Sequence, residues 1–159
     1  MSDLGDIFEI FSDSESMRFY PGIYSLEECR SLIAKQIKSQ QKNGFSLWAV
    51  ELKDHTFIGD CGITLQSIDS ELVPEIGYHI HKNYCRNGYA TEAAKAVMKY
   101  GFNEFGFEKL YIHTYVKNLP SRAVALKLQM TQTKEYDKFI KDHNLVMRHV
   151  VFEKARVAG

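Results

Sequence analysis

The sequence predicts one α/β domain over residues 1–159, with a mixed, mostly antiparallel central sheet and helices on both faces. The order of periodic segments leads to this prediction: two helical patterns, three strand-like runs, a long apolar helical stripe, and further strands around a short helix. Composition agrees with it. Hydrophobic residues make up 45% of the chain and charged residues 25%, which is close to the globular average and argues against disorder.

The first half of the chain is expected to form two helices and three strands. Apolar residues recur at helical spacing over 3–11, which predicts a short amphipathic helix. Ser25, followed by Glu28, is typical of a capping box that opens a second helix, ending at about Gln41. Strands are predicted over 45–52, 56–65 and 72–81, separated by a tight turn at 53–55 and a loop at 66–71.

The second half predicts a helix, a central strand, a shorter helix and two closing strands. A continuous apolar stripe from Ala90 to Phe105 indicates the long helix, and Gly106 is placed to end it. The remaining elements are a strand over 109–116, a helix over 121–130, and strands over 132–139 and 145–154. The ligand crevice is expected where the strands meet the start of the long helix.

The start of that helix has the features of an anion site. Residues 84–94 read Tyr-Cys-Arg-Asn-Gly-Tyr-Ala-Thr-Glu-Ala-Ala and follow a strand-like run at 74–80. The first N–H groups of a helix have no intrahelical partner, and small residues such as Gly88 and Ala90 let phosphate oxygens approach the backbone. The segment therefore predicts a phosphorylated ligand; the alternative is an ordinary strand-to-helix turn.

Charge, cysteine and histidine patterns exclude several classes of function. Lys+Arg and Asp+Glu both total 20, so no general electrostatic affinity for nucleic acid or for an anionic membrane is expected. Three widely spaced cysteines do not form a disulfide or zinc pattern, which fits a cytoplasmic protein. No apolar run reaches membrane-spanning length. The six histidines lack close-set companion ligands, so no metal site is predicted.

Three motifs in order resemble the GNAT acetyltransferases. They are Glu-Ile-Gly-Tyr-His-Ile at 75–80, Arg-Asn-Gly-Tyr-Ala-Thr-Glu-Ala at 86–93 and Asn-Leu-Pro-Ser at 118–121. The nearest branch is the RimJ/RimL-like one, which acetylates the N-termini of ribosomal proteins. The resemblance extends over about 3–154 and implies a GNAT-like fold and a transferase that uses acetyl-coenzyme A as cosubstrate.

The resemblance also implies how coenzyme A is held. The pantetheine arm is expected to lie like an extra strand along backbone groups near His79 and Ile80, admitted by a splay between the strands at 72–81 and 109–116. Asn118 is expected beside the pantetheine. The pyrophosphate is expected on the loop formed by Arg86, Asn87, Gly88, Tyr89, Ala90 and Thr91.

For the chemistry, the resemblance implies that an amine attacks the thioester directly in a ternary complex. Glu75 is the first candidate for the general base, and otherwise it is an exposed strand carboxylate. His79 is a second base candidate or a structural strand histidine. Ser121 is a candidate donor to the departing thiolate, or it only caps the following helix. The acceptor is a small-molecule amine or a protein N-terminus, bound near 19–21 and 67–75, and a homodimer is left open.

The chain also departs from the family pattern. Cys85 replaces a longer side chain, Ala125 stands where many members have a tyrosine acid, and Gln129 replaces a glycine. The branch usually begins with a strand that carries a Leu-x-Leu-Arg pattern, whereas this chain starts in the following helix, so the first strand is expected to be missing. The alternative function is therefore a degenerate GNAT-like module that binds coenzyme A or a protein partner without catalysis.

Overall fold

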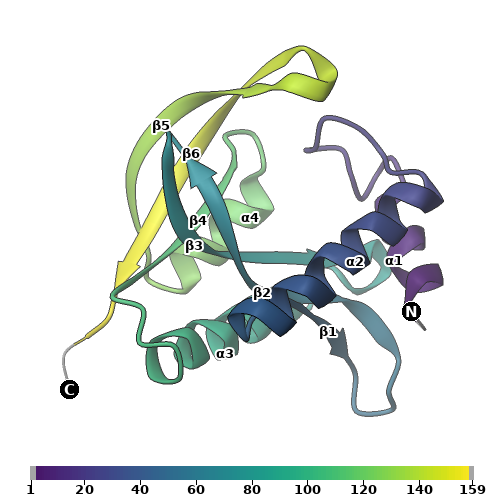
Figure 1. Ribbon diagram of the computed structural model, residues 1–159, viewed down its shortest axis with the longest axis horizontal. Helices are drawn as coiled ribbons and strands as arrows, with labels where there is room; N and C mark the ends of the chain where they lie inside the picture. The colour runs from purple at the N-terminus through teal and green to yellow at the C-terminus, as the bar shows by residue number, and fades with distance from the viewer. Residues whose placement is uncertain (1–2, 158–159) are drawn as a thin grey trace.

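Six strands form one sheet in the order β1-β2-β3-β4-β6-β5 in the computed structural model, which describes residues 3–157 (Figure 1). The strands are β1 Leu47–Glu51, β2 Phe57–Ile68, β3 Glu71–Ile80, β4 Lys109–Tyr115, β5 Thr131–Ile140 and β6 Leu145–Ala155. Every neighbouring pair is antiparallel except β3 and β4, which are parallel. The predicted mixed, mostly antiparallel sheet is confirmed, and β1 forms one of its edges.

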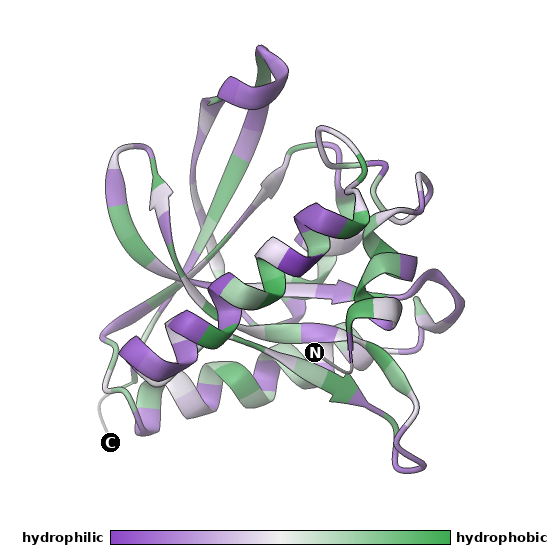
Figure 2. Cartoon of the chain, turned by 45° about the vertical axis from the view of Figure 1, so that its right-hand side comes forward, coloured by the Kyte–Doolittle hydropathy of each residue, from purple (hydrophilic) through white to green (hydrophobic). Residues whose placement is uncertain are grey.

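Helices cover both faces of this sheet. They are α1 Leu4–Phe11, α2 Leu26–Asn43, α3 Tyr89–Asn103 and α4 Leu119–Lys127, with short 3-10 turns η1 Lys82–Tyr84 and η2 Lys141–His143. One core contains residues of α3 and α4 packed on Cys61 and Ile63 of β2. A second contains residues of α1 and α2 packed on Phe57 of the same strand. Hydrophobic and hydrophilic residues alternate along these elements, as one-sided burial requires (Figure 2). No helix within residues 3–157 is long and apolar enough to span a membrane.

The start and end of α2 follow the local sequence. The Glu28 N–H donates to Oγ of Ser25 at 3.2 Å, and the Ser25 N–H donates to Oε2 of Glu28 at 2.7 Å, so the predicted capping box is confirmed. Gly44 follows the helix with φ 81°, a left-handed conformation that glycine adopts without steric cost.

The loop predicted at 66–71 is wrong. β2 runs on to Ile68 and β3 begins at Glu71, so only Asp69 and Ser70 form the turn. Both turn residues have positive φ, 50° and 70°, as a two-residue hairpin turn with the right twist requires. The polar side chains of this segment therefore lie on a solvent-facing hairpin, and their polarity does not mark a loop.

The two strands that border the expected crevice diverge. β3 and β4 pair only at Glu75 and Tyr111, although β3 continues to Ile80 and β4 to Tyr115. The predicted splay is thus present, and it opens toward the carboxyl ends of both strands. Beyond Glu75, β3 remains paired with β2 on its other side, where Ile80 lies opposite Gly59.

Candidate active site

A pocket of about 460 Å³ lies at the open end of this splay. It is walled by the end of β3, the starts of α3 and α4, and the segment after α1. Nine of the eleven residues predicted for the site line it: His79, Ile80, Arg86, Gly88, Tyr89, Ala90, Thr91, Asn118 and Ser121. Asn87 and Glu75 do not line it.

The N-terminus of α3 opens into this pocket without a side-chain cap. Gly88 is the N-cap residue, with φ 85°, and the first bond of the helix runs from the Glu92 N–H to the Gly88 carbonyl at 3.0 Å. The N–H groups before Glu92 therefore point out of the helix, and the helix dipole places partial positive charge there. A Cβ built on Gly88 would meet no atom within 4 Å, so the space in front of it is open.

Asn87 shapes the loop from outside the pocket. Its Nδ2 donates to the carbonyl oxygens of Tyr84 and Cys85, each at 3.2 Å. These bonds close the turn that leads to Arg86, which holds a left-handed φ of 65°. Such a conformation is unusual for a residue with a Cβ, and it is kept here because the Asn87 side chain satisfies the neighbouring carbonyls.

The charge of the pocket is one-sided. Arg18, Lys82, Arg86 and Lys127 line it, whereas no aspartate or glutamate within residues 3–157 does. The protein as a whole has no net charge, so this is a local concentration of cations. An anionic ligand that carries several phosphates complements it.

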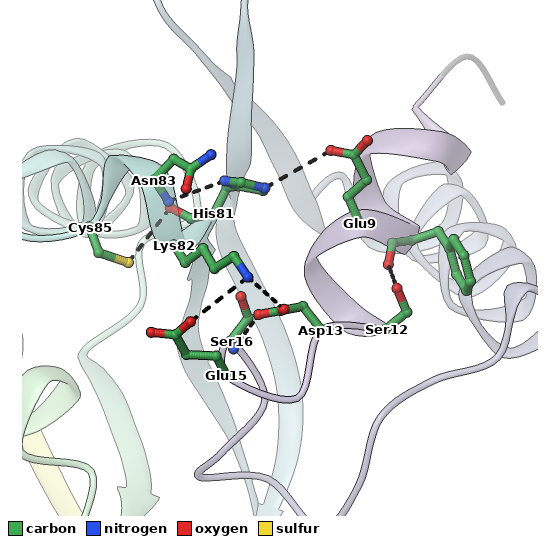
Figure 3. A network of polar contacts seen from close by, with 10 residues as sticks. Glu9, Ser12, Asp13, Glu15, Ser16, His81, Lys82, Asn83 and Cys85 are labelled. Carbon is green, nitrogen blue, oxygen red and sulfur yellow. Dashed lines mark hydrogen bonds and ion pairs between the residues drawn. The ribbon is translucent and has the colours of Figure 1, made fainter.

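A polar network joins the segment after α1 to the turn that follows β3 (Figure 3). Lys82 Nζ donates to Oδ1 of Asp13 at 2.7 Å and lies 3.8 Å from Oε2 of Glu15. The Ser16 N–H donates to the other carboxylate oxygen of Asp13 at 2.7 Å. The hydrogen bond from Lys82 lowers the pKa of Asp13 to about 2. The segment after α1 is thereby held against the turn that follows β3.

A hydroxyl pair lies on the α4 side of the pocket. The Tyr78 hydroxyl is 2.9 Å from Oγ of Ser121 and 3.1 Å from the Ser121 carbonyl oxygen. Burial raises the pKa of Tyr78, so its hydroxyl keeps its proton and remains a donor at neutral pH. Ser121 does not cap α4, because Asn118 does: its Oδ1 accepts the Ser121 N–H at 3.1 Å. The prediction that the helix begins at Ser121 is therefore wrong by two residues.

Glu75 lies where the two strands part, outside the pocket lining. Its side chain is 12% exposed, and Oε1 is 2.8 Å from Nδ1 of His113 on β4. The approach is off the direction of a ring hydrogen bond, so this is a close polar contact rather than a well-directed hydrogen bond. The first candidate base is thus engaged with a neighbour.

The second candidate base, His79, does reach the pocket. Its Nδ1 lies 2.8 Å from Oδ1 of Asp60, a buried residue directly opposite on β2. The ring packs against Phe11 at 4.7 Å and Tyr20 at 5.5 Å between centroids. Burial lowers the pKa of His79, but the charge and hydrogen bond of Asp60 outweigh it, so the net pKa is raised. Asp60 was not identified from sequence, because its role depends on the strand register.

The departures from the family pattern have clear structural positions. Cys85 is exposed at the pocket, and its Sγ lies 3.4 Å from the Ile80 carbonyl oxygen. Ala125 is fully buried in the core. Gln129 has φ 57°, so the turn after α4 keeps the left-handed geometry expected of glycine. The Gln129 N–H still donates to the Leu126 carbonyl at 2.9 Å.

Comparisons with known proteins agree with this arrangement. Residues 1–131 match the acetyltransferase (GNAT) domain. The uncharacterized N-acetyltransferase YnaD of Bacillus subtilis is 30% identical over 142 residues, which cover 87% of this chain and 79% of YnaD. An acetyltransferase (GNAT family) from Bacillus anthracis superposes with TM-score 0.80 and 26% identity over 97% of this chain and 89% of that one. RimL, a ribosomal-protein acetyltransferase solved with coenzyme A, superposes with TM-score 0.77 and 15% identity, over 97% of this chain and 89% of that one.

Proposed function

Because the chain belongs to the GNAT acetyltransferase family, we propose that it transfers the acetyl group of acetyl-coenzyme A to a primary amine by direct attack. The observation that supports this most directly is the uncapped start of α3, which opens into a pocket lined by Arg18, Arg86 and Lys127 and, within residues 3–157, by no carboxylate; a fourth cation of the lining, Lys82, is paired with Asp13. A pyrophosphate is the part of coenzyme A that such a site fits.

In this proposal the cofactor runs from the α3 N-terminus to the splay. The pyrophosphate accepts hydrogen bonds from the N–H groups that follow Gly88, and Arg86 adds a side-chain contact. The pantetheine lies along the edge of β3 near His79 and Ile80, an edge that β4 leaves unpaired beyond Glu75. Its amides would then take the place of a neighbouring strand.

In this proposal the hydroxyl groups of Tyr78 and Ser121 protonate the departing thiolate of coenzyme A. The amine nitrogen forms a bond to the thioester carbonyl carbon, and the carbon–sulfur bond breaks with its electrons on sulfur. A proton passed through the Tyr78 and Ser121 hydroxyls, 2.9 Å apart, would then reach the thiolate and be replaced from solvent, while the attacking nitrogen gives its proton to a base. Tyr78 thus supplies from β3 the phenol that the family often carries where this chain has Ala125.

The acceptor is proposed to enter from the side of the segment after α1. Met17, Phe19 and Tyr20 line the pocket there, and this segment lies off the cofactor loop. A protein N-terminus or a small-molecule amine fits this role. The structural likeness to a ribosomal-protein acetyltransferase supports the proposal that the acceptor is a protein N-terminus.

Two measurements test the proposed function. Coenzyme A should raise the melting temperature, because a ligand that binds only the folded state stabilises it by about 2.7 kcal/mol at a hundredfold excess over Kd. Thiol release from acetyl-coenzyme A is then followed with peptides beginning with serine or alanine, with spermidine and with glucosamine, and each product is identified by mass. Stabilisation without thiol release would favour the non-catalytic binding module. No stabilisation would refute both functions.

A further inference from the structure

Two consecutive residues of β3 reach the same pocket from opposite faces of the sheet. Tyr78 packs with the core under α3 and α4, whereas His79 packs against Phe11 of α1. Side chains alternate between faces along a strand, so both can line one pocket only if that pocket extends around the strand edge. The departure of β4 beyond Glu75 frees this edge.

The contacts around the His79 ring fix its orientation and engage its Nδ1 nitrogen, which leaves Nε2 to accept a proton. Asp60 lies behind it, 5% exposed, and engages Nδ1, which fixes the tautomer with the proton on that nitrogen. Nε2 then carries the lone pair. It has no hydrogen-bond partner within the described part of the chain, and it is not sealed from solvent. Phe11 and Tyr20 hold the ring on its sides.

We propose that His79 accepts the proton of the attacking amine and that Asp60 positions it for this step; the inference rests on the acetyl transfer proposed above. The amine proton passes to Nε2 as the carbon–nitrogen bond forms. The electrons of the carbon–sulfur bond leave with sulfur, which takes a proton from the Tyr78 hydroxyl while solvent replaces that proton through the Ser121 hydroxyl. The imidazolium then returns its proton to solvent.

The surroundings favour His79 over Glu75 for this role. Glu75 is engaged with His113 and lies outside the pocket, whereas His79 lines it. The charged groups that face His79 are Asp60 from β2 and Glu75 from its own strand; the contacts from α1 and from the following segment are the neutral rings of Phe11 and Tyr20. Both charges are negative and raise the pKa of His79, which makes its neutral ring a stronger base.

The test compares His79→Gln, Asp60→Asn and Glu75→Gln with the wild type. Turnover of acetyl-coenzyme A is measured with a serine-starting tetrapeptide and with spermidine. His79→Gln is expected to lower kcat by about 10²- to 10⁴-fold, the usual contribution of a general base, while the Kd for coenzyme A stays unchanged. His149→Gln is the matched control, because His149 is also a strand histidine but is buried outside the pocket lining, and it should keep the wild-type rate.

The pH profile separates positioning from a structural role. In the wild type the acidic limb of kcat is expected above pH 6.5, because protonated His79 cannot accept a proton and its pKa is raised. Asp60→Asn removes the negative charge, so the limb should move to lower pH while kcat falls. A variant that loses only melting temperature, with no movement of the limb, would overturn the role of Asp60.

The outcomes distinguish the two proposals. A wild type that never releases thiol refutes the proposed function and this inference with it. A wild type that turns over, while His79→Gln keeps its rate or only Glu75→Gln loses it, refutes the inference alone. If a variant fails to fold, the His79 ring signal is titrated by NMR in the wild type. It should titrate above pH 6.5 and shift when coenzyme A is added; a signal that does neither overturns the inference.

Discussion

Replacing Gly88 by glutamate tests the cofactor site most sharply. Gly88 has φ 85°, lines the pocket, and faces open space, because a Cβ placed there meets nothing within 4 Å. A glutamate at this position would direct a negative charge into the space that the pyrophosphate is proposed to fill. We expect coenzyme A binding to be lost from a variant that still folds.

The magnitude follows from two terms. A side chain in the left-handed region costs about 1–2 kcal/mol of folding stability, which lowers the melting temperature by roughly 2–8 °C in a chain of this size. Repulsion between the new carboxylate and one phosphate charge at about 4 Å is about 4 kcal/mol at an effective dielectric constant near 20. Since each 1.4 kcal/mol is tenfold, the Kd for coenzyme A should rise about 1,000-fold.

Gly106→Glu is the matched control. Gly106 also has a left-handed φ, 66°, and a Cβ placed on it would likewise meet nothing within 4 Å, but it does not line the pocket. The two variants therefore share the backbone cost and the change of charge. Isothermal titration calorimetry with coenzyme A should give a wild-type Kd for Gly106→Glu and no measurable binding for Gly88→Glu. Equal affinities in two folded variants would refute the placement of the pyrophosphate at the start of α3.

Three further changes test the scaffold. Gly62→Ala should destabilise the protein by about 1–3 kcal/mol in chemical denaturation, because the new Cβ would overlap the carbonyl oxygen of Ser46; an unchanged midpoint would contradict the close approach of β1 and β2. Ser25→Ala should cost about 1 kcal/mol through loss of the helix cap, seen as a lower melting temperature, whereas Ser25→Asp should restore it. Asp13→Asn should lower the melting temperature above pH 3.8, where the Lys82 pair is fully formed, and the difference from wild type should vanish as the pH falls through about 2. A difference that persists undiminished well below pH 2 would mean that the depressed pKa of Asp13 is not its cause.

Much of the fold was predictable because local signals determine it. The Ser25 cap, the long stripe of α3 and the closing strands each carry their own periodicity or end signal, and each was found in the expected place. The two incorrect predictions concern the loop at 66–71 and the start of α4. Both depend on the backbone conformation or backbone hydrogen bond that a polar residue adopts, which residue type alone does not determine. Asp69 and Ser70 take left-handed conformations that their residue types do not demand, and Asn118 occupies the N-cap position that was one of the two roles considered for Ser121.

The candidate site likewise has one part that local sequence predicts and another that depends on the tertiary fold. The loop at 86–91 is contiguous in sequence, so its geometry could be anticipated from spacing and small residues. Asp60 lies 19 positions before its partner His79, and Ser121 lies 43 positions after Tyr78, so both pairs depend on which strands and helices become neighbours. A sequence pattern cannot reveal such pairs before the register of β2 on β3 is known.

That register explains why β3 can carry both ends of the proposed proton path. Ile80 is paired with Gly59 and His79 with Asp60, without interruption back to the hairpin turn. A slip of one residue would move His79 to the face of Tyr78 and leave Asp60 buried without its partner, which is costly for a carboxylate. The buried Asp60–His79 pair therefore favours the single register that places the proton acceptor on the acceptor side and the hydroxyl pair on the thiolate side. On this reasoning Asp60→Asn should weaken catalysis by removing the charge that fixes the tautomer of an otherwise intact ring.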